Sequence, residues 1–405
     1  MSSRAPITPF SSNPDFDFDI RVAIGLSIAG AGDPGEILAA TQPVKKKDHE
    51  GWFTAWLGLA DGTMDAADRS ASAGHRVSAA WAYLRASAYY SSAVNAASAL
   101  DVPDRLAATF RRQQDAWRGF IGHAPVEVST VAIPYEQNPL PGYVFRAPTR
   151  RPNGNPLLVG VNGSDGPLAG MWTWCIAPAL ERGYDVLVFD GPGQQSQLFE
   201  KNIPFRPDWE HVLTPVYDFA ATLDGIDAER IAVYGISQGG YWVTRGISFE
   251  HRFAAAITDP GVLDVSASWL VNIPSSLIKT LDRGETDKFD REMALGMKLT
   301  PGAARTWAFR ARPYGTTGYA ETIDAVRTYN ATDVAHQIST PLLILDPENE
   351  QFWPGQAQKL AALTSGVSTL LPFTAAEGAD GHCQPLARGV TAQRVFDWLD
   401  EKLAR

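Results

Sequence analysis

Residues Gly235-Ile236-Ser237-Gln238-Gly239-Gly240 form a G-x-S-x-G pattern just past the middle of the chain. The apolar run RIAVY precedes the pattern and a helical stretch follows it, so Ser237 is expected on a sharp strand-to-helix turn. The residues two before and two after the serine must be small, because a Cβ there would collide with the neighbouring strand and helix. A serine held this way can act as a nucleophile. The competing interpretation is one more turn in a chain with 35 glycines.

A nucleophilic serine needs a histidine base, which should come from a loop after the last strands. His382 lies in the glycine-rich stretch EGADGHCQP, after the last predicted strand and before the final helix. A single loop histidine is often only solvated, but its order and position here favour catalysis. His336 is the alternative, although it precedes the strand PLLIL, where such bases do not normally occur.

The acid that would orient the histidine is expected in the stretch LLILDPENEQFWPGQ. Asp346 ends the strand, whereas Glu350 falls four residues further, in the loop where such folds usually hold this carboxylate. We therefore expect Glu350 to be the acid, with Asp346 as the alternative and Glu348 as a third candidate. Because glutamate is one methylene longer than aspartate, the loop must lie slightly further back.

Two backbone N–H groups are candidates for an oxyanion hole. The N–H of Gln238, at the start of the helix, should point to the site where a carbonyl oxygen becomes negative. In VNGSDGP, Gly163 would let the backbone turn so that the N–H of Ser164 faces the nucleophile. A plain Asn-Gly turn is the alternative. The turn FDGPGQQ is expected to shape the site and not to take part in the chemistry.

The chain divides into a helical part and a part in which apolar runs alternate with helices. Residues 1–124 have helical periodicity, with Val77, Trp81, Leu84 and Ala88 recurring on one face. Two antiparallel strands are predicted next, VEVSTVAIPYE and LPGYVFRAP, and then the strands PLLVGVNG, YDVLVFDGPG, RIAVYGIS, AAAITDPG, PLLILDPE and STLLPFTA. Continuous apolar strands between helices indicate an α/β fold, with a mostly parallel sheet covered on both faces.

The connection between the strand ending near Thr258 and the strand starting at Pro341 is unusually long, at roughly 80 residues. We expect an inserted helical cap there. The predicted organisation is a helical N-terminal domain at 1–124, a sheet domain at 125–263 and 339–405, and the cap at 264–338. A helical-repeat scaffold that binds peptides is the alternative for the N-terminal part, but no period repeats three times.

Bulk composition argues against several classes of protein. The net charge is −10 and no basic run is longer than Lys45-Lys46-Lys47, so we expect no nucleic-acid partner. No signal-peptide pattern or apolar run of membrane-spanning length is present, which predicts a cytoplasmic protein without a membrane partner. Cys175 and Cys383 are too few for a disulfide scaffold, and the seven histidines form no HxxxH or HExxH pair. We expect no metal.

From about residue 35 to its end, the chain resembles one branch of the α/β-hydrolases. The stretches that carry the resemblance are AGHRVSAAWAYLRASAYY, IPYEQNPLPGYVF, VNGSDG, ERGYDVLVFDGPGQ, FRPDWEHVLTPVYDF, YGISQGGYW, ITDPGVLD, ENEQFWPGQAQKL and EGADGHCQ. The branch looks like that of 2,6-dihydroxypseudooxynicotine hydrolase and the fungal polyketide-shortening hydrolases of pigment synthesis, and is broadly esterase or prolyl-oligopeptidase-like. The resemblance implies an α/β-hydrolase fold with a mostly parallel eight-stranded sheet, a helical N-terminal domain, a cap, no cofactor and often a homodimer.

The resemblance also implies roles for individual residues. Ser237 and His382 fall on the nucleophile and the base of this branch, whereas Glu350 falls where its members usually carry aspartate. Gln195 replaces a glycine that is common after GPGQ. The stretch VNGSDG keeps the branch's NG-x-DG form, in which Asp165 is expected to brace the loop.

The sequence thus predicts a cofactor-free serine hydrolase for a small apolar, aromatic or polyketide-like carbonyl compound. Loss of an alcohol from the acyl group would make it an ester or lactone hydrolase, and loss of a stabilised carbanion would make it a C–C bond hydrolase. An acyltransferase with the same triad, or a catalytically silent binding protein on this fold, is the alternative. Trp81, Tyr89, Trp269 and Trp307 would suit an aromatic pocket, although each also fits a core position.

Overall fold

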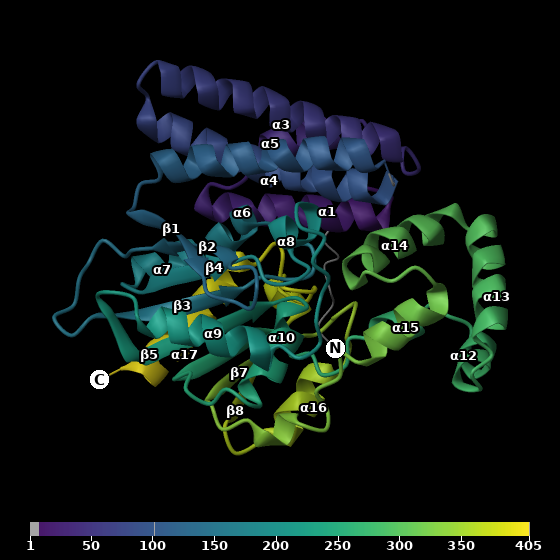
Figure 1. Cartoon of the computed structure of the whole chain (residues 1–405). Coiled ribbons are helices and arrows are strands. Elements are labelled where there is room, and N and C mark those ends of the chain that lie inside the picture. Colours follow the sequence, from purple (N-terminus) through teal and green to yellow (C-terminus); the bar gives the residue numbers. More distant parts are fainter. Residues whose placement is uncertain (1–7, 101, 405) are drawn as a thin grey trace.

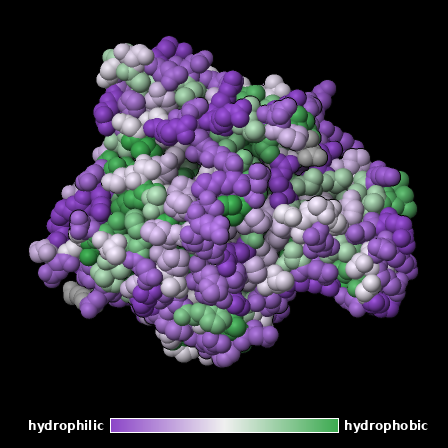
Figure 2. Space-filling model, in the orientation of Figure 1, coloured by the Kyte–Doolittle hydropathy of each residue, from purple (hydrophilic) through white to green (hydrophobic). Residues whose placement is uncertain are grey.

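The computed structural model describes residues 8–100 and 102–404. It has three parts: a layer of long N-terminal helices, a central sheet with helices on both faces, and a group of helices that projects to one side (Figure 1). The face of the molecule that Figure 2 shows is mostly polar, with small hydrophobic patches over the sheet domain and the projecting helices. No helix in the described ranges has the length and apolar content needed to cross a bilayer.

The sheet has eight strands in the order β1-β2-β4-β3-β5-β6-β7-β8. β2 pairs antiparallel with β1 and with β4, and all the other neighbours are parallel. The predicted fold class, a mostly parallel eight-stranded sheet, is therefore confirmed. The strands are β1 (Val128–Ile133), β2 (Leu140–Phe145), β3 (Asn155–Val161), β4 (Asp185–Phe189), β5 (Ile226–Ile236), β6 (Ala255–Asp259), β7 (Leu342–Pro347) and β8 (Ser368–Phe373).

The central strands are buried on both faces because successive side chains point to opposite sides of a sheet. In β3, Leu157 and Val159 join the core beneath α9, α10 and α16, whereas Leu158 joins the core on the other side, with η2 and α17. The helices of the sheet domain are α6 (Leu168–Met171), η2 (Trp172–Ile176), α7 (Ala177–Glu181), α8 (Gln195–Phe199), α9 (Glu210–Ala221), α10 (Gly239–Ile247), α16 (Gln356–Leu363), η5 (Ala375–Glu377) and α17 (Arg388–Leu403).

The N-terminal layer consists of α1 (Pro14–Gly25), η1 (Leu26–Ala29), α2 (Pro34–Thr41), α3 (His49–Ser72), α4 (Arg76–Leu100) and α5 (Pro103–His123). The start of α1 is set by Asn13, whose side chain accepts the N–H of Asp15 and Phe16, with proline at the first helical position. α4 packs between α3 and α5 and is buried on most of its circumference.

Val77, Trp81, Leu84 and Ala88 all lie in α4, the helix that their spacing predicts, but they differ in exposure. Leu84 and Ala88 are buried, whereas Val77 is 71% exposed. Val77 lies in the first turn of the helix, and the burial of α4 on several sides means that a single apolar stripe does not describe its packing.

The connection between β6 and β7 contains α11 (Ala267–Leu270), α12 (Ser275–Asp282), α13 (Thr286–Leu299), α14 (Pro301–Ala311), η3 (Arg312–Tyr314), α15 (Tyr319–Arg327) and η4 (Ala335–Gln337). Of these, α12, α13, α14 and α15 form the projecting group in Figure 1. α14 contacts α4, so the inserted helices and the N-terminal layer meet.

Candidate active site

Ser237 lies on the turn between β5 and α10, with a positive φ of 57° that is rare for residues other than glycine. Its N–H donates to the carbonyl of Asp259 over 2.6 Å. A Cβ at Gly235 would lie 2.2 Å from the Gly239 carbonyl oxygen, and one at Gly240 would lie 2.1 Å from the Pro260 carbonyl oxygen. Only glycine fits these positions, so the backbone around Ser237 is held in one strained arrangement.

Ser237, His382 and Glu350 form one hydrogen-bonded chain. The Nε2 atom of His382 lies 2.9 Å from the Ser237 Oγ, and its Nδ1 atom lies 2.9 Å from both carboxylate oxygens of Glu350. The side chains of His382 and Glu350 are each only 5% exposed. The order of groups is that of a nucleophile, a base and an acid that orients the base.

Within this hydrogen-bonded chain, the charges of Glu350 and His382 stabilise each other. Burial disfavours a charged Glu350, but His382 and the backbone N–H groups of Phe352 and Trp353 lower the pKa of Glu350 overall. Burial also disfavours an imidazolium at His382, but the adjacent Cys383 and Glu350 hold the pKa of His382 well above its usual value. Because burial raises the pKa of the Cys383 thiol, Glu350 is the charge that stabilises the imidazolium.

The other candidates for base and acid lie elsewhere. Asp346 accepts two hydrogen bonds from Gln358 Nε2, at 2.7 and 2.6 Å, and does not contact His382. Glu348 is exposed and accepts the N–H of Ala375 at 2.8 Å. His336 is exposed in η4.

The candidate oxyanion loop follows β3. Within the described ranges, no acceptor takes the N–H of Gln238 or of Ser164. The N–H of Gly163, by contrast, donates to Asn162 Oδ1 over 2.8 Å, so it is not free to act as a further donor. The glycine is required by close approach and not by a turn, because a Cβ there would lie 2.9 Å from the Ser237 Cβ.

Two glutamines after β4 brace this loop. Gln194 Nε2 donates to the carbonyls of Asn162 and Gly163, at 2.9 and 3.0 Å, and Gln195 Nε2 donates to the carbonyl of Asp165 at 3.0 Å. Asp165 takes part in this bracing through its backbone carbonyl, and its carboxylate accepts a hydrogen bond from the Ser164 hydroxyl at 3.0 Å. Gln195 has a φ of 30°, a backbone conformation that glycine adopts more readily than other residues.

A cavity of about 130 Å³ opens beside Ser237. Its walls come from the sheet domain and from α1 and α4, and its lining includes Phe18, Asp19, Ser91, Ser92, Asn95, Asp165 and Trp174. None of Trp81, Tyr89, Trp269 and Trp307 is among the lining residues. Sequence reasoning missed the contribution of α1, although an acid at position 19 falls between Phe16 and Ala23 on the buried side of the helix.

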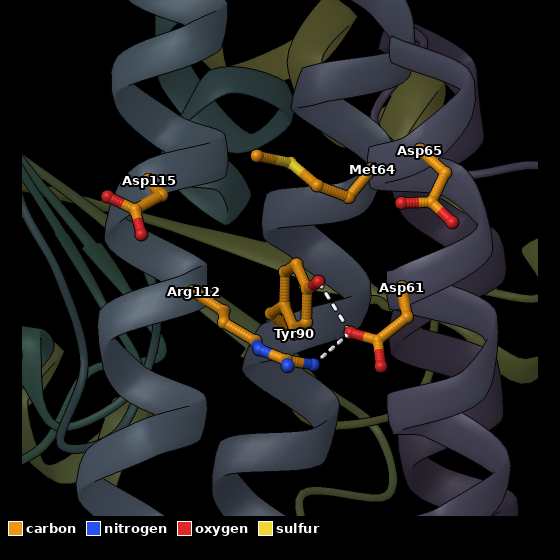
Figure 3. Close-up of a pocket in the computed structure, with 6 residues that line it drawn as sticks. All are labelled: Asp61, Met64, Asp65, Tyr90, Arg112 and Asp115. Atoms are coloured by element: carbon orange, nitrogen blue, oxygen red, sulfur yellow. Dashed lines mark hydrogen bonds and ion pairs between the residues drawn. The ribbon is translucent and has the colours of Figure 1, made fainter. Parts of the chain in front are cut away.

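A second cavity, of about 370 Å³, lies among α3, α4 and α5 and shares no lining residue with the first. Its Asp61 accepts hydrogen bonds from Tyr90 and Arg112, each at 2.6 Å (Figure 3). The cluster contains no nucleophile paired with a base. Within the described ranges, no three His, Cys, Asp or Glu side chains gather in a way that would hold a metal ion.

Comparison with known proteins agrees with this architecture. The chain is 33% identical to alpha/beta hydrolase xenA of Xenoacremonium sinensis, with 97% of both chains covered. It is 31% identical to 20-hydroxy-prefusarin hydrolase FUS2 of Gibberella moniliformis, with 64% of both covered. The crystal structure of 2,6-dihydroxy-pseudo-oxynicotine hydrolase superposes with a TM-score of 0.71 at 20% identity, covering 94% of this chain and 95% of that one, which shows a shared fold. A model of the alpha/beta hydrolase family matches residues 157–393, and the chain therefore belongs to this family.

Proposed function

We propose that the chain is a cofactor-free serine hydrolase that cleaves the bond next to a carbonyl in a small aromatic or polyketide-like compound. The hydrogen-bonded chain from Ser237 Oγ through His382 to Glu350, beside a cavity, is the observation that carries the proposal. A serine hydroxyl that is hydrogen-bonded to a neutral imidazole can lose its proton as it attacks a carbonyl.

In this mechanism His382 takes the proton of Ser237 while Oγ bonds to the carbonyl carbon. The N–H groups of Gln238 and Ser164 stabilise the negative oxygen, and Glu350 stabilises the imidazolium. His382 then gives its proton to the leaving group, and an acyl-enzyme remains on Ser237. Water, deprotonated by His382, releases the acid and restores the serine.

The leaving group decides the bond type. An alcohol leaves from an ester or lactone, and a carbanion stabilised by a second carbonyl leaves from a diketone; both accept the proton of His382. The names of the relatives favour small oxygenated substrates, since one of them is 20-hydroxy-prefusarin hydrolase. Both bond types therefore belong in the first activity screen.

The proposal is tested by the hydrolysis of 4-nitrophenyl acetate and of 1-phenylbutane-1,3-dione, with the products identified by chromatography. Ser237→Ala should lower kcat/KM by roughly 10³-fold or more on whichever substrate is cleaved. Ser72→Ala changes an exposed serine at the end of α3 and should behave as the parent. Undiminished hydrolysis by Ser237→Ala would overturn the proposal, and transfer of the acetyl group to added methanol in place of water would indicate an acyltransferase.

A further inference from the structure

Two carboxyl groups line the cavity that contains Ser237 and His382. Asp19 comes from α1 and Asp165 from the loop after β3. No lysine or arginine is among the described residues that line the cavity. Asp19 is half-buried, whereas Asp165 is exposed. An ionised carboxylate that has little water and no cation beside it is costly, so Asp19 is the group that needs a proton or a ligand.

Asp19 has fewer neighbouring groups than Asp165 that would stabilise its ionised form. Phe18, Val22 and Ala23 line the cavity around it, and the only hydrogen-bond partner of its carboxyl within the described ranges is the Trp52 side chain. Burial, and after it the charges of Asp165 and Asp15, raise the pKa of Asp19 to about 7. A large fraction of the molecules therefore carries a neutral carboxyl at Asp19 near neutral pH.

Asp165 is better placed to stay ionised. The protein atoms around it raise its pKa overall, although the Ser164 hydroxyl, His382 and Arg310 oppose that rise. Arg310 is fixed in the inserted helices by hydrogen bonds to the Ser268 carbonyl and hydroxyl, at 3.2 and 2.7 Å. The positive charge of Arg310 therefore stabilises the ionised form of Asp165. Asp19 is the carboxyl that keeps its proton.

We propose that Asp19 is a substrate-binding residue, whose protonated carboxyl donates a hydrogen bond to an oxygen that the substrate carries away from the carbonyl attacked by Ser237. This inference rests on the proposed function. It narrows the substrate class to neutral compounds with a second oxygen acceptor. Ser91, Ser92 and Asn95 of α4 line the same cavity and offer further neutral hydrogen-bonding groups for such a ligand.

A neutral ligand fits this wall better than a cation does. A cation would have to displace the proton from Asp19 and would lie in a cavity whose remaining carboxylate is already near Arg310. A ligand oxygen accepts a hydrogen bond from the protonated carboxyl of Asp19 and adds no charge to the cavity. The two possibilities have opposite pH dependence, because a ligand oxygen binds the protonated carboxyl and a cation binds the ionised one.

The experiment measures binding calorimetrically in the full chain carrying Ser237→Ala, so that no turnover occurs. The probes are 1-phenylpentan-1-one, 1-phenylpentane-1,4-dione and the trimethylammonium derivative of the first at its chain end. Asp19→Asn keeps a donor that cannot ionise, and Asp19→Leu removes the donor. Asp65→Asn, which changes an exposed aspartate of α3 (Figure 3), is the matched control.

At about pH 6 the dione should bind the Ser237→Ala parent roughly fivefold more tightly than the ketone, and this preference should fall as pH rises through about 7. Asp19→Asn should keep a preference that no longer changes with pH, Asp19→Leu should lose it, and Asp65→Asn should match the parent. Thermal melting checks that each variant is folded.

The proposal is overturned if the dione binds the parent no more tightly than the ketone, or if its preference survives in Asp19→Leu. It is also overturned if the trimethylammonium probe binds best and tightens with pH through Asp19. Since binding is measured without the Ser237 hydroxyl, these outcomes are independent of whether Ser237 proves to be the nucleophile.

Discussion

Arg388 and Asp259 form a buried ion pair beneath the loop that carries His382. The guanidinium Nη1 lies 3.1 Å from the Asp259 Oδ2, and the two side chains are 2% and 0% exposed. Arg388 also donates to the Cys383 carbonyl at 2.7 Å, and the Asp259 carbonyl accepts the N–H of Ser237. The pair therefore ties the loop of the candidate base to the turn of the candidate nucleophile.

Breaking this pair should cost stability. Arg388→Met leaves the Asp259 carboxylate buried without its cation, and we expect a loss of about 3–5 kcal/mol in the free energy of unfolding. Urea denaturation measures it. Arg394→Met, on the same helix, removes a pair with Glu377 that is 28% and 40% exposed and should cost less than about 1 kcal/mol. Equal losses in the two variants would contradict the structural role of the buried pair.

The two candidate acids should differ in their effect on rate. Glu350→Gln removes the charge that faces His382 Nδ1 and should lower kcat by roughly 10³-fold or more on a substrate that the parent cleaves. Asp346→Asn changes a group held by Gln358 and should stay within about threefold of the parent. Steady-state kinetics would contradict the assignment if Asp346→Asn were the slower variant.

The pH dependence of kcat/KM should report His382. Its pKa is raised well above the usual value, so the imidazolium persists to higher pH and the rate should increase with pH up to and through that raised pKa. Removing the Glu350 charge should shift the rising limb to lower pH. The residual activity of Glu350→Gln, followed across pH, tests this shift, and a limb that stays in place would argue against control by Glu350.

The bracing of the oxyanion loop should affect turnover more than substrate binding. Gln195→Ala removes the hydrogen bond to the Asp165 carbonyl and the one from Gln113, at 3.0 Å each. We expect kcat to fall by about tenfold with a smaller change in KM, because misplaced N–H groups weaken transition-state stabilisation. Gln42→Ala, an exposed position after α2, is the control; the same change in both would indicate a global effect.

Asp19 should make stability depend on pH. Its pKa is about 7 in the folded chain and near 3.8 when unperturbed, so the folded state binds more protons between these values. Stability should therefore fall as pH rises across this range, by at most roughly 4 kcal/mol. Urea midpoints should show that Asp19→Asn gains stability over the parent at about pH 8 and little at pH 4. A gain that is equal at both pH values would contradict the raised pKa.

The sequence alone predicts those parts of the fold and of the candidate site that depend on local sequence pattern. Order and spacing along the chain indicate the strand before Ser237, the glycines around it and the position of His382 after the last strand. Six of the strands follow from apolar runs, and the first two follow from an alternating stretch and the turn after it. Glu350 and Asp346 lie four residues apart at the end of one strand, and their side-chain partners separate them: Gln358 holds Asp346, while Glu350 faces His382.

The contribution of α1 to the cavity could not be predicted in this way. Asp19 and Ser237 line one cavity only because the N-terminal layer packs against the sheet domain, and no spacing in the sequence encodes that packing. The sequence also did not reveal that Asn162 takes up the N–H of Gly163, because this depends on the side-chain rotamer within the loop.

The most direct measurement of the central claim is covalent labelling of the full chain with a fluorophosphonate, followed by peptide mapping by mass spectrometry. The account predicts one modified residue, Ser237, with labelling lost in Ser237→Ala and strongly slowed in His382→Ala because the imidazole no longer accepts the serine proton. Absence of label on Ser237 in the folded parent, or equal labelling in His382→Ala, would contradict it.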